Sequence, residues 1–143
     1  MKNYPKYIFK FPIDKNEITV AILSNKNNLK KIINIVHKEI RKKMKLFLKK
    51  NKDKKIVILD IPLLLENKIN NKKDILIFVD SKKKDIEKRL IKRKNFDRKL
   101  FNKFKKIQYS SRYKKKRSHF VIKNNFTNKS VRMGINYILN KIM

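Results

Sequence analysis

Cysteine is absent from this 143-residue sequence, and glycine occurs only once, at Gly134. Without cysteine the chain cannot form a disulfide scaffold, a cysteine-based zinc site or a cysteine nucleophile. A single glycine also excludes the phosphate-binding patterns G-x-x-x-x-G-K-[ST] and G-x-G-x-x-G, because each needs at least two glycines. The length suits one domain.

Long hydrophobic runs are missing as well. No apolar run reaches the roughly 18 residues that a membrane-spanning helix needs. The first five residues, Met1 to Pro5, place a lysine and a proline where a signal peptide would have its apolar stretch. We therefore expect a cytoplasmic protein with no membrane partner.

Acidic residues are scarce: 11 Asp and Glu stand against 42 Lys and Arg, which gives a formal net charge of +31. A charge of this size favours nucleic acids or anionic surfaces through counterion release. However, most of the basic residues are lysines spread over positions expected to face solvent, and Lys, Asn and Ile dominate the chain, as an AT-rich gene would produce. We favour this compositional interpretation and expect no specific nucleic-acid partner; a small basic nucleic-acid-binding protein is the alternative.

The first third of the chain is predicted to be helical. Asp14 and Glu17 have the spacing of a capping box, which predicts a short helix through Leu23. Ser24 or Asn25 can then cap a longer helix. Its apolar residues recur at spacings of one, three and four and define one helix face: Leu29, Ile32, Ile33, Val36, Ile40, Met44 and Phe47.

The pattern then changes to continuous β-branched runs. Residues 55–60 and 74–80 each form an apolar run that ends in an acid, and residues 119–122 form a third candidate strand. Runs of this kind are typical of strands buried in a parallel sheet. Before these, residues 7–12 form either a short strand or a loosely packed lead-in.

Helical patterns separate and follow these strands. Ser81 and Asp97 can cap two helices between the second and third strands, and a last helix begins at about Asn128. Strands separated by helices predict an α/β fold. Because ligands bind beyond the carboxyl ends of such strands, we expect Asp60, Pro62, Asp80 and Asn124 near any site.

The sharpest local feature is the segment from Asp60 to Glu66, DIPLLLE. A buried strand that delivers an acid at its tip is the physical form of a Walker B element, whose carboxylate holds Mg²⁺ or its water. The segment also resembles the V-P-L-L-[FVY]-E signature of the dephospho-CoA kinases.

Further motifs of that family follow in the same order. Residues 88–93 (KRLIKR) are similar to the family's R-x-x-x-R stretch, and residues 120–124 (FVIKN) resemble its D-x-V-I-x-N segment. Gln108 and Lys114 stand where the family has a glutamine and often a basic residue. Upstream, residues 35–40 (IVHKEI) are similar to a family helix with the pattern L-x-x-[IV]-[IVL]-H-P-x-[VI]. The resemblance extends from about Ile13 to Ile142.

This resemblance implies a kinase that phosphorylates the ribose 3′-hydroxyl of dephospho-CoA with ATP, the last step of coenzyme A biosynthesis. The fold would be a partial P-loop kinase fold, with parallel strands flanked by helices, a helical CoA-binding part and a helical lid. Residues 1–143 would form one incomplete kinase domain. Its helical substrate part would span about 12–50, its core 55–81 and 118–143, and its lid-proximal helices 82–117.

The resemblance also assigns roles to residues. Arginines suit phosphoryl transfer, which depends on charge neutralisation at the phosphate oxygens, so Arg93 and Arg89 are the catalytic candidates. Asn124 is the nucleotide-binding candidate. Any metal would be Mg²⁺ that arrives with ATP, and no residue is assigned to hold a metal. The substrate-binding candidates are Asp60, Pro62, Leu63, Leu64, Glu66 and Gln108.

The sequence departs from the family pattern at several points. The glycine-rich phosphate loop and the acid that follows it are missing, Lys38 replaces a proline, Ser118-His119 replaces Ala-Asp, and Phe126 replaces a glycine. Without the phosphate loop we expect this polypeptide alone to be inactive, since that loop supplies much of the electrostatic stabilisation. The simplest hypothesis is a truncated reading of a longer gene, with Met1 an internal methionine. A non-catalytic remnant that binds CoA-like molecules is the alternative.

Overall fold

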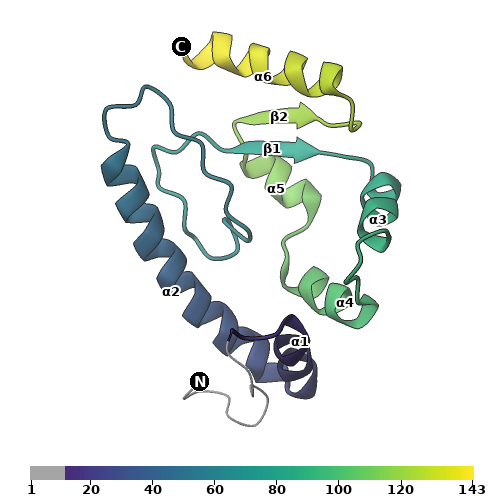
Figure 1. The fold of residues 1–143 in the computed structure, drawn as a ribbon. Helices are drawn as coiled ribbons and strands as arrows, with labels where there is room; N and C mark the ends of the chain where they lie inside the picture. Colours follow the sequence, from purple (N-terminus) through teal and green to yellow (C-terminus); the bar gives the residue numbers. More distant parts are fainter. Residues whose placement is uncertain (1–11) are drawn as a thin grey trace. The chain divides into compact units, whose positions relative to one another are not determined.

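The computed structural model describes residues 12–143, which fold into an α/β arrangement of six helices and two parallel strands (Figure 1). The α/β class with a parallel sheet is therefore confirmed. The alternation predicted at residues 7–12 falls almost entirely outside the described residues. By their contacts the described residues form two units, 12–62 with Arg98–Lys103, and Leu63–Asp97 with Phe104–Met143. In order, the elements are α1 (Lys15–Ser24), α2 (Lys26–Lys50), β1 (Ile77–Asp80), α3 (Lys83–Ile91), α4 (Arg98–Ile107), α5 (Ser111–Arg117), β2 (Phe120–Lys123) and α6 (Asn128–Ile142).

The two helices of the first unit begin where the capping residues predict. The Asp14 side chain accepts a hydrogen bond from the backbone N–H of Asn16 at 2.7 Å, and Asn25 accepts one from Asn27 at 2.8 Å. Of the two candidates for the second cap, Asn25 is thus the one used. Side-chain acceptors at these positions satisfy backbone donors that have no partner within the helix.

The junction between α1 and α2 holds the small core of this unit. Ala21, Ile22 and Leu29 are buried there, together with the polar side chain of Asn28. The Asn28 amide donates to the carbonyl of Ala21 at 2.7 Å, which compensates for its burial. In contrast, Val36 and Phe47 on the predicted apolar face of α2 are 46% and 47% exposed.

The strand predicted at residues 55–60 is wrong. The described chain has no strand there, and the side chain of Ile58 is 85% exposed. High β-propensity indicates only that a residue fits a pleated, packed surface. A strand also needs a hydrogen-bonded neighbour, and residues 55–60 pair with no strand in residues 12–143.

The sheet of the second unit is formed by the other two predicted strands. β1 and β2 are parallel, with Ile77 opposite Phe120 and Asp80 opposite Lys123, so β1 is shorter than the predicted 74–80 (Figure 1). Ile77 and Val79 on β1 remain 44% and 54% exposed. Full burial of these runs was therefore the wrong expectation for a sheet of two strands.

Helix α6 lies beside β2 (Figure 1) and buries Ile122 and Ile138. Gly134 allows this approach, because a Cβ atom at that position would lie 3.0 Å from Cγ2 of Ile122. The only glycine of the sequence thus serves close helix–strand packing.

Three helices lie between the strands in the described residues, where the sequence predicts two. Helix α3 is preceded by Lys82, which makes no side-chain capping bond, so the cap predicted at Ser81 is wrong. Helix α4 begins directly after Asp97. Ser110 caps α5 through a hydrogen bond from the N–H of Tyr113 at 3.2 Å. No helix among residues 12–143 combines the length and the apolar character that a membrane crossing requires.

Candidate functional site

The carboxyl ends of β1 and β2 bring Asp80 and Asn124 together. The backbone N–H of Asn124 donates to the carbonyl of Asp80 at 2.8 Å. Lys115 of α5 adds a cation, since its Nζ lies 3.1 Å from Oδ2 of Asp80. Two of the four residues expected near a site, Asp80 and Asn124, therefore lie side by side.

A turn after β2 places Phe126 beside helix α3. The Asn124 side chain accepts a hydrogen bond from the N–H of Phe126 at 2.8 Å, and Phe126 has a φ of 65°. This is the left-handed region, which glycine adopts most readily and which is strained for an aromatic residue. The glycine that Phe126 replaces in the family pattern therefore stands at a position whose backbone conformation favours glycine.

The ring of Phe126 lies under an arginine of α3. The guanidinium carbon of Arg89 is 4.4 Å from the ring centroid, which is a cation–π contact. Because Arg89 is otherwise on an exposed helix face, this contact holds its positive charge beside the edge formed by Asp80 and Asn124. An anionic group could bind the guanidinium of Arg89 by charge. The side-chain amide of Asn124 could hydrogen-bond a planar ligand that offers both a donor and an acceptor.

The leucines of the signature form a tight turn. Leu63 has a φ of 56°, and its carbonyl accepts hydrogen bonds from both the backbone N–H and the side-chain amide of Asn67, at 3.1 and 2.8 Å. The N–H of Ile69 closes the turn on the carbonyl of Leu64 at 3.1 Å. Leu63 and Leu64 are half-buried, and Ile69 is buried.

Glu66 ends the signature in an ion pair. Its Oε1 lies 2.8 Å from Nζ of Lys114 and accepts the N–H of Tyr109 at 2.8 Å. Burial of the side chain raises the pKa of Glu66. The hydrogen bonds from Lys114, from its own backbone N–H and from Tyr109, together with the charge of Lys114, outweigh this effect and hold the pKa below its ordinary value.

The remaining candidate residues lie outside these contacts. Arg93 is exposed in the turn after α3, and its N–H donates to the carbonyl of Leu90 at 3.1 Å. Gln108 is exposed at the end of α4. Asp60 and Pro62 are exposed and belong to the first unit, so the signature is divided between the two units after Pro62.

No group of three or more His, Asp or Glu side chains in the described part of the chain could hold a metal ion. The side chains at the carboxyl ends of the strands are the cations of Arg89 and Lys115, the carboxylate of Asp80 and the amide of Asn124. Sequence reasoning left Lys115, Phe126 and Tyr109 out of the site. Only Phe126 had a signal, because it departs from the family's glycine.

The chain is similar to known proteins of one kind. The model of the family described as dephospho-CoA kinase matches residues 9–130. The dephospho-CoA kinase of Wolbachia pipientis wMel is 32% identical over 123 residues, which are 85% of this chain and 63% of that protein. That of Fusobacterium nucleatum subsp. nucleatum is 33% identical over 113 residues, which are 79% of this chain and 58% of that protein. The chain spans about three-fifths of the length of these relatives.

Proposed function

Because this chain belongs to the dephospho-CoA kinase family, we propose that it serves the ATP-dependent phosphorylation of the ribose 3′-hydroxyl of dephospho-CoA, the last step of coenzyme A biosynthesis. The reaction is a phosphoryl transfer to an alcohol. We place it in the cytoplasm.

The observation that supports this proposal most is the cluster at the carboxyl edge of the sheet. Segments far apart in the sequence contribute Arg89, Asp80 and Asn124 to it, through the 4.4 Å contact of Arg89 with Phe126 and the 2.8 Å bond between Asn124 and Asp80. Arginines stabilise the charge on a transferring phosphoryl group, so Arg89 and Arg93 act on the phosphates. Asn124 contacts the adenine edge of the nucleotide.

The signature contributes to substrate binding. In this proposal Leu63 and Leu64 contact dephospho-CoA, and so do Asp60, Pro62 and Gln108. Glu66 acts through the turn that it ends, since its Oε1 already binds Lys114 and the N–H of Tyr109. It is a positioning residue for the leucines.

ATP enters as its Mg²⁺ complex, with the metal bound to the nucleotide's phosphates. Phosphate cradles in nucleotide kinases are made from glycine-rich loops, whose backbone N–H groups bind the phosphate oxygens. The 143 residues contain one glycine, in helix α6, and so cannot form such a loop. We therefore propose that these residues alone bind dephospho-CoA but do not transfer phosphate to it.

Calorimetry with dephospho-CoA tests the binding part. We expect saturable binding with a dissociation constant in the millimolar range or below. Arg89→Gln should lose about tenfold in affinity, because in this proposal its guanidinium also faces the phosphates of dephospho-CoA. Arg112→Gln on α5 is the matched control, because Arg112 is also an exposed helix arginine but lies outside the cluster. Absence of heat at millimolar dephospho-CoA, or equal losses in both variants, would contradict the proposal.

A coupled assay for ADP formation tests the second part. The chain with ATP, Mg²⁺ and dephospho-CoA should give no ADP above the background of ATP alone. Turnover that depends on dephospho-CoA would show that phosphate transfer does not require the missing loop.

A further inference from the structure

A cavity of about 640 Å³ lies in the second unit at the amino ends of the two strands. Its wall includes Asp74 and Leu76, which precede β1, and Ser118 and His119, which precede β2. Because the strands are parallel, the amino ends of both lie at one end of the sheet, and Asp80 and Asn124 lie at the other. The cavity is therefore separate from the cluster assigned to the kinase reaction.

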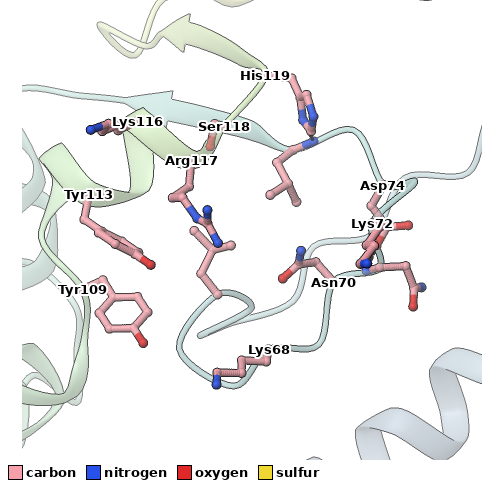
Figure 2. A pocket seen from close by; sticks show the side chains of 13 residues that line it. Lys68, Asn70, Lys72, Asp74, Tyr109, Tyr113, Lys116, Arg117, Ser118 and His119 are labelled. Atoms are coloured by element: carbon pink, nitrogen blue, oxygen red, sulfur yellow. Dashed lines mark hydrogen bonds between the residues drawn. The ribbon is translucent and has the colours of Figure 1, made fainter.

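Positive charge dominates the lining. The lining residues include four basic ones, Lys68, Lys72, Lys116 and Arg117, against the single carboxylate of Asp74. That carboxylate already accepts the N–H of Asn71 at 2.8 Å through Oδ2. Figure 2 shows the guanidinium of Arg117 directed into the middle of the cavity, between the tyrosines and Asn70. An anionic ligand thus meets a planar, bidentate donor at the centre.

Two aromatic rings form one side of the cavity. The centroids of Tyr109 and Tyr113 are 4.6 Å apart with an interplanar angle of 53°. The two residues are 41% and 43% exposed, so ring surface remains free to contact a ligand. Both rings lie on the Arg117 side of the cavity (Figure 2). A planar ring on the ligand could pack here while its anionic group reaches Arg117.

Hydrogen bonds of the lining residues hold the walls of the cavity in place. The N–H of Leu76 donates to Nδ1 of His119 at 2.9 Å, and the N–H of His119 donates to the carbonyl of Leu76 at 2.8 Å. On the other side, the N–H of Tyr109 is held by Glu66 at 2.8 Å. A cavity whose walls are held before binding costs less ordering when a ligand enters.

We propose that this cavity binds a small phosphorylated molecule with a planar ring, of the mononucleotide class. The phosphate binds Arg117 with Lys68 and Lys72, and the ring packs against Tyr109 and Tyr113. The volume lies within the range of about 300–1,000 Å³ that is usual for small-molecule sites. The proposal does not rest on the kinase reaction, since no residue of the carboxyl edge takes part.

The test uses AMP as the probe on the ¹⁵N-labelled chain. We expect AMP to shift the amide signals of Leu76, His119 and Tyr113, and to leave that of Asn124 unchanged. Arg117→Gln should weaken AMP about tenfold, and Tyr109→Leu should weaken it several-fold. Arg112→Gln, on the same helix but outside the cavity, should bind AMP as the unaltered chain does.

Ring and phosphate are separated by two further titrations. Adenosine and inorganic phosphate should each bind at least about tenfold more weakly than AMP. Equal binding of phosphate and AMP would overturn the ring contact, and equal binding of adenosine would overturn the phosphate contact. Shifts at Asn124 that disappear in Arg89→Gln would place AMP at the carboxyl edge and overturn the proposal, without affecting the kinase assignment.

Folding of the variants is checked from their amide spectra. If Arg117→Gln or Tyr109→Leu keeps the dispersion of the unaltered chain and still binds AMP normally, the proposal is contradicted. Tyr109→Phe provides a second variant should Tyr109→Leu unfold, because it keeps the ring and should keep AMP binding within about twofold. Displacement of AMP by a random oligonucleotide at sub-stoichiometric amounts would indicate a nucleic-acid surface and overturn the small-molecule assignment.

Discussion

Glu66 and Lys114 form an ion pair in which Oε1 and Nζ are 2.8 Å apart and the Glu66 side chain is only 8% exposed. The two residues are far apart in the sequence. Their pair joins the end of the DIPLLLE signature to helix α5, and the N–H of Tyr109 binds the same carboxylate oxygen.

Removing the lysine should cost more than removing the charge of the acid. Lys114→Met leaves a buried carboxylate with one donor fewer, and we expect a loss of about 1–3 kcal/mol in the free energy of unfolding. Glu66→Gln keeps an acceptor for Tyr109 and should lose less. Urea denaturation of both variants measures the difference, with Lys116→Met on the same helix as the control. A smaller loss for Lys114→Met than for Glu66→Gln would contradict the assignment of Lys114 as the main partner.

The same carboxylate predicts a pH dependence. The pKa of Glu66 is lowered in the folded chain, so its ionised form stabilises the fold above the unfolded pKa, which is about 4.3 for glutamate. That contribution is lost as the pH falls through the folded pKa. Thermal melts between about pH 6 and pH 3 should show a decline below about pH 4 that is smaller in Glu66→Gln. Identical acid profiles would show that other carboxylates carry the effect.

Sequence patterns predicted helices better than strands in this chain. The caps at Asp14 and Asn25 depend on neighbours two residues away, and both form as expected. The strand predicted at residues 55–60 depends on a partner elsewhere, and its apolar run could not reveal that none is present in the described chain. Burial could not be predicted either. Val79 lies in an apolar run typical of a core strand, but its side chain is 54% exposed.

At Phe126 a glycine variant should be more stable than an alanine variant, which is the reverse of the order in a helix. The φ of 65° at Phe126 strains any residue with a Cβ atom, so Phe126→Gly should be more stable than Phe126→Ala by about 1 kcal/mol. Both variants remove the ring. At Asn136, an exposed position of α6, glycine should instead be less stable than alanine by about 1 kcal/mol. Chemical denaturation of the four variants measures these differences in stability. If the alanine variant is more stable than the glycine variant at both positions, the left-handed turn at Phe126 is excluded.

The Phe126 ring also couples to Arg89. If the 4.4 Å cation–π contact holds the guanidinium in place, Arg89→Gln should cost about 0.5–1 kcal/mol in the unaltered chain and close to nothing in Phe126→Gly. This double-mutant cycle is independent of any ligand. Equal costs in both backgrounds would show that the ring does not position Arg89.

The candidate site was predictable to the extent that it follows from strand ends. Asp80 and Asn124 follow two strands that could be recognised, and parallel pairing brings them together. The contacts of Arg89 with Phe126 and of Glu66 with Lys114 depend on the path of turns with positive φ, at Phe126 and Leu63. Residues other than glycine seldom adopt that conformation, so their sequence carries little sign of it.

Gly134 provides a further test of packing between α6 and β2. An added Cβ atom would lie 3.0 Å from Cγ2 of Ile122, and Ile122 is buried. Gly134→Ala should therefore gain little of the roughly 1 kcal/mol that alanine usually adds in a helix, and Gly134→Leu should destabilise by about 1–3 kcal/mol. Full gain of helix propensity in Gly134→Ala would contradict the close approach.

Lys103 should stabilise the first unit through the end of α1. Its Nζ donates to the carbonyl of Ile22 at 2.6 Å, and α1 has no basic residue in its own last turn. A cation at this position interacts favourably with unpaired carbonyls at a helix C-terminus. Lys103→Met keeps the apolar stem and should cost about 1 kcal/mol in the free energy of unfolding. Lys99→Met, on the same helix and exposed, should stay within about 0.5 kcal/mol of the unaltered chain. Equal costs for the two lysines would show that general charge, and not the carbonyl of Ile22, determines the effect.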